Sequence, residues 1–267
     1  MSLTDLDELE NKSIYIIREA YARYRNLAML WSIGKDSTTL VWLCRKAFLG
    51  RPPFPFIHID TGRKFKEIYE FRDRYVREWK LDLLIAQSPR AREQAPSFAD
   101  KLECCTELKT NALKRLLAER KFDALLLAIR RDEHGIRAKE RFFSPRDSEF
   151  KWNYLDQPAE FWDQYGSAAE ADTHLRIHPL LDWREIDIWR YVQRERIPVV
   201  SLYFAREGRR YRSIGCETCC QPVPSSATTI DEIVEELRTT RIAERSGRAQ
   251  DKEQAYMMQK LRSLGYM

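Results

Sequence analysis

Ser32 to Ser37 is a short run of small, polar and charged residues whose composition suits an anion-binding loop. It follows an apolar stretch and precedes a helical pattern, so backbone amides and a helix N-terminus would face an anion there. Lys35 would add a positive charge. The run lacks the first glycine and the spacing of GxxxxGK[ST], which disfavours a conventional P-loop GTPase or kinase. An ordinary helix-capping turn, with Ser32 or Asp36 as the cap, is the alternative interpretation.

A second group of chemically active residue types, His58 to Gly62, ends another apolar stretch. Asp60, Thr61 and Gly62 supply a carboxylate, a hydroxyl and a glycine, which would meet a nucleotide if the stretch is a strand of an α/β sheet. The other interpretation is a surface turn. His58 and the later His134 are expected to be structural or hydrogen-bonding residues rather than general bases.

A third group is a dense set of cations after a further apolar stretch. Arg130 and Arg131 open it, followed by Asp132 and Glu133, and the set continues with Arg137, Lys139, Arg141 and Arg146. Guanidinium groups bind phosphates and other oxyanions through bidentate contacts. A charge run can also be a solvated face. Three such groups, each after an apolar stretch, together indicate a site for a polyanion.

Four of the six cysteines form two close pairs, Cys104 with Cys105 and Cys216 with Cys219. Four thiolates from two segments can complete a tetrahedral zinc site or hold a 4Fe-4S cluster, and the thiolate count alone does not separate the two. The alternative is a set of buried free cysteines. Cys44 lies in an apolar helical pattern and is interpreted as a core residue.

The elements that must position these groups alternate between strand and helix patterns. This alternation predicts an α/β fold with a doubly wound, mostly parallel sheet, whose ligands lie at the carboxyl ends of the strands. Apolar runs predict strands, and periodic patterns predict helices. The expected strands are 26–31, 54–60, 81–86, 122–128 and 175–177, and the expected helices are 3–24, 35–48, one after residue 60, 106–120 and 184–196.

An aromatic stripe on the helix after residue 60 predicts core packing, because its members recur at spacings of three and four. It comprises Phe65, Ile68, Tyr69, Tyr75, Val76 and Trp79. Residues 130–171 show little periodicity and are expected to form a long loop over the substrate. We expect residues 1–200 to form one nucleotide-binding domain, and residues 201–267 an irregular C-terminal extension that carries the CxxC pair and the ERSGR segment.

The composition limits the class of protein. The chain has 267 residues, 43% hydrophobic and 33% charged, and can bury one large core. A net charge of +5 suits anionic ligands but is weak for a nucleic-acid-binding surface. Without a secretory pattern or an apolar run of about 20 residues, we expect a cytoplasmic protein with no membrane partner and with reduced thiols.

Several segments, taken in order, carry a family resemblance. The Ser32–Ser37 loop resembles that of the PP-loop ATP pyrophosphatases, with Ile33 where a glycine is commonest. The whole chain resembles the small subunit of bacterial sulfate adenylyltransferases, a branch of the PAPS-reductase-like adenine nucleotide α-hydrolases. The segments are SIGKDS at 32, HIDTG at 58, YEFRDR at 69, RRDE at 130, RAKER at 137, the stretch around Trp162 and ERSGRAQDKE at 244.

This resemblance implies cleavage of Mg-ATP between the α and β phosphates, with sulfate as the leading acceptor and a GTPase large subunit as a possible partner. By motif, the residues implied to bind the β and γ phosphates are Ser32, Gly34, Lys35, Asp36 and Ser37. Those implied to lie beside the nucleotide are Asp60, Thr61 and Gly62. Arg130, Arg131 and Arg137, together with Lys35, are implied to act on the reacting groups.

The cysteine set departs from that branch and resembles the cluster ligands of adenylyl-sulfate reductases, which favours iron-sulfur over zinc. Such reductases use a C-terminal cysteine, and none follows Cys220 here, so a reductase is disfavoured. Cys220 is either a spare thiol or a sulfur-handling nucleophile. The alternative function is an iron-sulfur ATP pyrophosphatase of a DNA phosphorothioation system, with a cysteine desulfurase and DNA-modification proteins as partners. A cluster-bearing sensor is a third alternative, disfavoured by the retained phosphate-binding residues.

Overall fold

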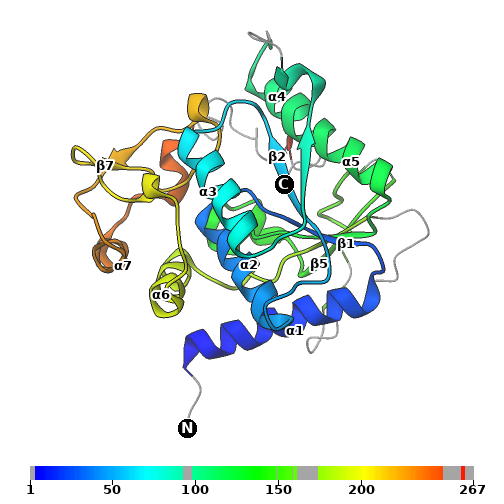
Figure 1. The fold of residues 1–267 in the computed structure, drawn as a ribbon, viewed down its shortest axis with the longest axis horizontal. Coiled ribbons are helices and arrows are strands. Elements are labelled where there is room, and N and C mark those ends of the chain that lie inside the picture. Colours follow the sequence, from blue (N-terminus) through cyan, green and yellow to red (C-terminus); the bar gives the residue numbers. More distant parts are fainter. Residues whose placement is uncertain are drawn as a thin grey trace.

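A six-stranded sheet runs through the molecule in the order β3-β2-β1-β4-β6-β5 (Figure 1). This computed structural model describes residues 4–92, 98–148, 150–157, 159–160, 174–248 and 260–261. All neighbouring strands are parallel except β5 and β6. The predicted doubly wound, mostly parallel α/β sheet is therefore confirmed. The strands are β1 Leu27–Leu30, β2 Phe56–Asp60, β3 Leu83–Gln87, β4 Ala124–Leu126, β5 Phe143–Arg146 and β6 His174–Ile177.

The central strand β1 is buried on both faces, as its continuous apolar sequence requires. Leu27 and Met29 point into the larger core, whereas Ala28 and Leu30 point into a smaller core on the opposite face. Side chains alternate along a strand, so this one strand contributes to two separate hydrophobic layers.

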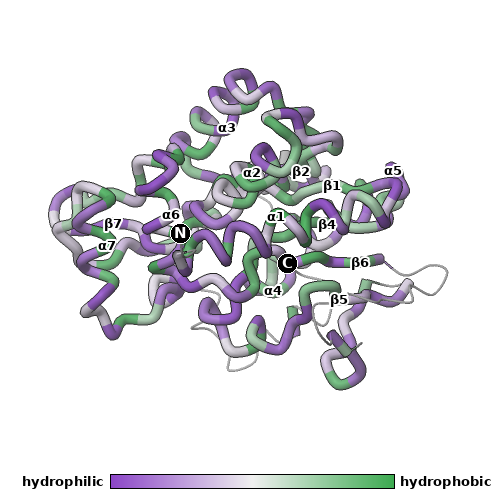
Figure 2. Tube along the Cα trace, turned by 90° about the horizontal axis from the view of Figure 1, so that it is seen from below, coloured by the Kyte–Doolittle hydropathy of each residue, from purple (hydrophilic) through white to green (hydrophobic). Residues whose placement is uncertain are grey.

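Helices cover both faces of the sheet (Figure 1). The larger core is formed with α1 Asp5–Arg23, α2 Lys35–Ala47, α3 Lys66–Glu78 and α6 Glu185–Glu195. The smaller core is formed with α5 Ala112–Arg120. In Figure 2 the trace of α3 is mainly hydrophilic, whereas those of β1 and β4 are hydrophobic, as expected for a surface helix over a buried sheet.

The helical stretch that bears the first cysteine pair begins earlier than predicted. It runs from α4 Lys101–Cys105 through a π-helical segment, Thr106–Asn111, into α5. Its start is fixed by Asp100, whose side chain accepts the amide of Glu103 at 2.7 Å as an N-cap. The pair therefore lies at the junction between α4 and the π-helical segment and not at a helix start.

The aromatic stripe on α3 packs into the larger core, as its spacing predicts, with one exception. Phe65, Ile68 and Trp79 are buried there, but Tyr69 is only partly buried and its hydroxyl donates to Asp60 at 2.8 Å. Phe71 occupies the core beside Trp31 instead, with ring centroids 6.5 Å apart.

The region after β4 is more ordered than the loop that we expected. It contains the 3-10 turns Arg131–Glu133 and Arg137–Lys139 and the antiparallel strand β5. The four residues of β5, FSPR, show no alternating pattern that would predict a strand, and the strand forms by antiparallel pairing with β6. The stretch around Trp162 lies outside the described residues.

Between residues 201 and 248, all of which the structure describes, the chain forms a small hairpin and one further α-helix. The hairpin joins β7 Arg209–Arg210 to β8 Val223–Pro224, and α7 spans Ile230–Thr239. A capping box between Thr229 and Glu232 begins α7, a sequence signal that our pattern analysis did not use. A 3-10 turn, Glu244–Gly247, follows α7. Among the described helices, none has the length and apolar character to span a membrane.

Two buried histidines make the stability of the fold dependent on pH. Burial, reinforced by Lys64 and Arg72, lowers the pKa of His58 to about 3. Burial, reinforced by Arg176 and Arg146, likewise lowers the pKa of His174 to about 3. Below the ordinary histidine pKa the unfolded chain therefore takes up protons that the folded chain does not.

We expect each histidine to make the fold about 2 kcal/mol less stable at pH 5 than at pH 7. Urea denaturation at the two pH values measures the loss. His174→Phe, which removes one titrating ring, should recover about half of the combined difference. An unchanged pH dependence in this variant would contradict the assignment of His174.

Candidate functional site

The Ser32–Ser37 loop connects β1 to α2 and presents the N-terminus of that helix. Gly34 is the N-cap of α2 and has no side-chain cap. The amide of Lys35 donates to the Tyr203 hydroxyl at 2.8 Å, and the hydroxyls of Ser32 and Ser37 lie 3.0 Å apart. Ile33 has a φ of 67°, a left-handed conformation that disfavours β-branched residues. This backbone requirement explains why a glycine suits the position.

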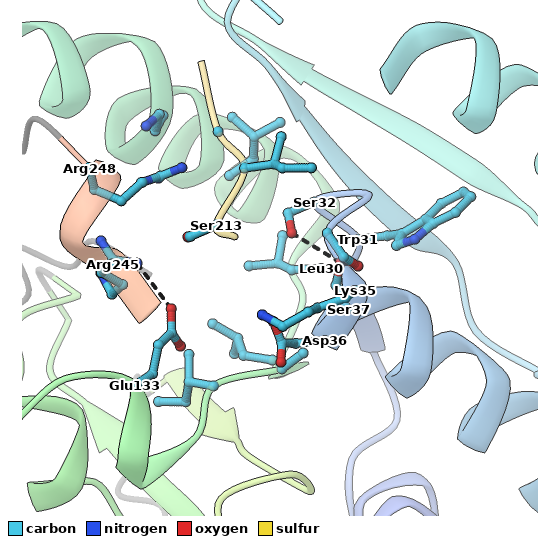
Figure 3. Close-up of a pocket in the computed structure, with 18 of the residues that line it drawn as sticks. Leu30, Trp31, Ser32, Lys35, Asp36, Ser37, Glu133, Ser213, Arg245 and Arg248 are labelled. Atoms are coloured by element: carbon cyan, nitrogen blue, oxygen red, sulfur yellow. Dashed lines mark hydrogen bonds and ion pairs between the residues drawn. The ribbon is translucent and has the colours of Figure 1, made fainter. Parts of the chain in front are cut away.

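A pocket opens between this loop and the C-terminal 3-10 turn, at the carboxyl ends of β1 and β4 (Figure 3). The strand order changes direction between β1 and β4, which is the position where open α/β sheets bind ligands. Of its described lining residues, six carry cations and two carry carboxylates. The cations are Lys35, Lys64, Lys109, Arg137, Arg245 and Arg248, and the carboxylates are Asp36 and Glu133.

Apolar side chains form the other part of the lining. Leu30 and Trp31 come from the end of β1, Leu127 and Ile129 follow β4, and Ile214 precedes the CxxC segment. The pocket therefore joins a hydrophobic wall to a strongly cationic region, a combination that suits a ligand with both an aromatic base and several anionic groups.

A buried ion network links the loop to the C-terminal turn. Lys35 donates to Asp36 at 3.0 Å and also to Glu244, which lies 209 residues away in the chain. Arg130 is fully buried, and it donates to Asp36, to Glu244 and, at 2.9 Å, to Asp132. Burial by itself raises the pKa of Glu244, but Arg130 and Lys35 bring it below the ordinary range. The carboxylate is therefore ionised at neutral pH.

A second ion group lies beside the first. Glu133 accepts from Arg245 at 3.0 Å and from Arg137. Burial opposes ionisation of Glu133, but these two arginines, with Arg130 and Lys35, lower its pKa well below the usual value. In Figure 3, Glu133 and Arg245 face Lys35 and Asp36 across the pocket.

Several sequence-predicted residues lie outside the pocket lining, among them Arg130, which is buried in the ion network. Arg131 points toward the surface, where its side chain is 35% exposed and pairs with Asp182. Asp60 accepts the Gly62 amide at 2.8 Å, and the Thr61 hydroxyl lies 3.3 Å from the Cys216 sulfur. The end of β2 therefore supports the second cysteine pair. His58 also lies outside the lining, with Nδ1 3.0 Å from the Trp31 carbonyl oxygen.

The two cysteine pairs lie in one region beside the pocket. Cys216 forms a backbone bridge with Lys64, and Cys104 interacts electrostatically with both Cys105 and Cys216. Burial and these two thiols raise the pKa of Cys104 to about 11. The amide of Cys219 donates to the Cys216 carbonyl at 3.0 Å.

Cations surround these thiols. The ammonium of Lys109 lies 3.7 Å from the Cys105 sulfur, and Arg63 lies 4.0 Å from that of Cys104. Among the described residues, no three His, Cys, Asp or Glu side chains are arranged to hold a single metal ion. The metal-site prediction therefore stays a prediction.

Sequence reasoning missed several lining residues. Lys64, Lys109 and Tyr203 were not singled out, although each is near a segment that was. Arg245 and Arg248 of the lining, and Glu244 of the buried ion network, were noticed only as part of the ERSGRAQDKE resemblance. No local pattern distinguishes Glu244 and Arg245 from surface charges, because their partners are more than a hundred residues away.

Comparison with known sequences gives one matching domain family and relatives that align along nearly the whole chain. Residues 26–222 match the phosphoadenosine phosphosulfate reductase domain. The protein named sulfate adenylyltransferase subunit 2 of Saccharophagus degradans is 39% identical, over 99% of this chain and 98% of its own length. The protein of the same name from Rhizobium meliloti is 40% identical, over 98% of this chain and 92% of its own.

Solved structures share the fold at low sequence identity. A Candida auris phosphoadenylyl-sulfate reductase in complex with phosphate superposes with a TM-score of 0.55 at 16% identity, over 84% of this chain and 99% of its own. The Candida glabrata FMN adenylyltransferase in complex with ATP superposes with a TM-score of 0.58 at 18% identity, over 83% of this chain and 66% of its own. These likenesses support the α/β architecture.

Proposed function

The chain belongs to the phosphoadenosine phosphosulfate reductase domain family and, within it, to the sulfate adenylyltransferase subunit 2 proteins, and on that basis we propose that it transfers the adenylyl group of ATP to sulfate. The products are adenylyl sulfate and pyrophosphate. The observation that carries the proposal is the pocket at the switch point of the sheet, which joins an apolar wall to six cations.

In the proposed complex, adenine lies against the apolar wall and the β and γ phosphates lie on the Ser32–Ser37 loop. Gly34 and the amides of Asp36 and Ser37 at the N-terminus of α2 hold the phosphates, with Ser32 and Ser37 as hydroxyl donors. Lys35 adds a charge next to Asp36. Mg²⁺ arrives with ATP as part of the substrate. Asp60, Thr61 and Gly62 act indirectly, by supporting Cys216 and Lys64 beside the pocket.

Sulfate is held on the opposite side of the pocket, by Lys64, Lys109 and Arg248. These cations form one group, since both Lys109 and Arg248 act electrostatically on Lys64. A sulfate oxygen attacks the α phosphorus, the bond to the bridging oxygen breaks, and pyrophosphate leaves. Sulfate is already deprotonated, so the reaction needs no general base. The protein's contribution is to hold two mutually repelling anions together and to stabilise the transition-state charge.

The arginines after β4 take different roles in this proposal. Arg137 lines the pocket and binds the reacting groups together with Lys35. Arg130 holds the loop and the C-terminal turn together from behind, through Asp36 and Glu244. A direct role for Arg131 would require its side chain to leave Asp182, so we assign it the weakest contribution of the three.

The test is pyrophosphate release from Mg-ATP by anaerobically purified protein, with and without sulfate. Sulfate-stimulated release with adenylyl sulfate as the product would establish the activity. Release that is indifferent to sulfate would overturn the acceptor and favour the alternative role in sulfur insertion into DNA. The name "subunit 2" of the relatives also leads us to propose a partner subunit. A GTPase large subunit is the candidate, and its addition should increase the rate.

We also propose that Cys104, Cys105, Cys216 and Cys219 hold a 4Fe-4S cluster. The support is chemical. Three of the four thiols lie beside cations, Cys105 by Lys109, Cys104 by Arg63 and Cys216 by Lys64, whose charges would offset those of thiolates bound to iron. Four thiolates can serve either metal, and iron is preferred over zinc because the cysteine spacing resembles that of the cluster ligands of adenylyl-sulfate reductases. When bound, the cluster would supply electron transfer or a structural brace.

Cys216→Ser is expected to abolish any brown colour of anaerobically purified protein, because a serine oxygen is a poor ligand for iron. Visible absorption and assays of iron and acid-labile sulfide measure the change. Cys44→Ser is the matched control, since Cys44 is buried on α2 and contacts Met29. A colourless wild-type protein that contains zinc would overturn the iron assignment.

A further inference from the structure

Cys220 is a buried thiol that neither the proposed reaction nor the proposed cluster uses. Its side chain is 3% exposed, and it lies directly after the CxxC segment. The sulfur accepts two N–H donors, the Gly215 amide at 3.0 Å and Nη1 of Arg248 at 3.1 Å. Gly215 and Arg248 both line the pocket. Cys220 thus lies immediately behind the pocket wall.

The backbone already brings the two segments together, but backbone contacts alone do not set the direction of the arginine side chain. Cys220 forms a backbone bridge with Arg248, and the Gln221 amide donates to the Gly247 carbonyl at 2.9 Å. These contacts place the Cα of Arg248. An arginine side chain has several rotatable bonds beyond that atom, so a further contact must select the direction of its guanidinium.

Two features select that direction. The Cys220 sulfur binds Nη1, and Gly215 leaves open the space that the guanidinium occupies, because a Cβ at Gly215 would overlap it. In Figure 3 the Arg248 side chain extends from the C-terminal turn into the pocket. Its guanidinium acts on Lys64 together with Lys109, in the part of the pocket that we assign to sulfate.

We propose that Cys220 is a positioning residue for acceptor binding, which holds the Arg248 guanidinium in the oxyanion part of the pocket. The proposal rests on the proposed function for the identity of the acceptor. It concerns Cys220 as a hydrogen-bond acceptor and involves no covalent step. In this proposal Cys220 acts neither as a spare thiol nor as a sulfur-handling nucleophile.

The first experiment measures kinetic constants of Cys220→Ala. We expect the KM for sulfate to rise about tenfold while the KM for ATP stays within about twofold, because one charged contact to the acceptor is misplaced. Cys220→Ser keeps an acceptor atom and should give a smaller rise. Cys44→Ala is the matched control, since it truncates a buried cysteine away from the pocket lining. Gly215→Ala, which displaces the same guanidinium from the other side, should reproduce the Cys220→Ala effect.

A double-mutant cycle separates positioning from a general structural role. If Cys220 acts through Arg248, adding Cys220→Ala to Arg248→Ala should not change the KM for sulfate further. An equal additional rise in that background, or a wild-type KM for sulfate in Cys220→Ala alone, would overturn the proposal. A rise confined to the KM for ATP would overturn it as well.

A binding measurement keeps this test independent of turnover. Calorimetry compares the affinities of adenylyl sulfate and AMP, two probes that differ in the sulfate group. Cys220→Ala should reduce the preference for adenylyl sulfate about tenfold and leave AMP binding unchanged. Absence of sulfate-dependent pyrophosphate release by the wild type would count against the proposed function, whereas an unchanged preference in the variant would count against the role of Cys220.

Discussion

Lys35→Ala is expected to lower the rate of pyrophosphate release from Mg-ATP by about a hundredfold to a thousandfold. Lys35 is the only lysine of the Ser32–Ser37 loop, and its ammonium faces the pocket beside Asp36. A fixed positive charge near the transferring phosphates stabilises the charge that develops as pyrophosphate leaves. The loss should therefore appear mainly in kcat and not only in the KM for ATP.

Two controls show whether the effect arises from this position. Lys66→Ala removes the same charge from a side chain that is 86% exposed, and it should release pyrophosphate at the wild-type rate. Circular dichroism should show a folded Lys35→Ala protein, because Arg130 still pairs with both Asp36 and Glu244. Undiminished release by folded Lys35→Ala would remove the loop from the mechanism.

Arg130→Ala is expected to reduce the free energy of unfolding by about 3–5 kcal/mol, the usual cost of leaving buried charges without their partner. Arg130 is fully buried and pairs with Asp36, Asp132 and Glu244. Its removal leaves Lys35 to balance the carboxylates of both Asp36 and Glu244. Urea denaturation measures the loss.

The neighbouring arginine is the matched control for this loss. Arg131→Ala removes an identical side chain, but Arg131 is 35% exposed and its partner Asp182 is 36% exposed. Surface pairs of this kind contribute less than about 1 kcal/mol. Equal losses in the two variants would show that burial of the Arg130 network does not stabilise the fold.

The contrast between these two arginines shows where sequence reasoning ends. The run Arg130–Glu133 is recognisable as a cation cluster after a strand, and by sequence alone both arginines are equally good candidates for the site. Arg130 has an extended backbone, with φ of −126° and ψ of 152°, and consecutive side chains of extended chain point in opposite directions. One therefore enters the ion network, and the other reaches the surface.

The sequence by itself determined the alternation of β1 to β4 and β6 with their helices, the anion-binding loop and the family, because each of these depends on residues that are close together, whereas β5, the β7–β8 hairpin and α7 were not predicted. Burial and turn chemistry along a strand or helix are local, and all six residues of the loop are contiguous. The predicted ends of the helices were less accurate. The helical stretch predicted to begin at residue 106 begins at Lys101, because the N-cap Asp100 decides where it starts.

Only the tertiary structure decided which charges meet. Glu244 reaches Lys35 across 209 residues and Arg130 across 114, and Arg248 reaches Cys220 across 28. No periodicity encodes such pairs. They exist because the parallel sheet brings the carboxyl ends of β1 and β4 to one edge, and because the segment after α7 returns across that edge. Because these charged groups are buried away from water, each of them is stable in its ionised form only while its partner is present.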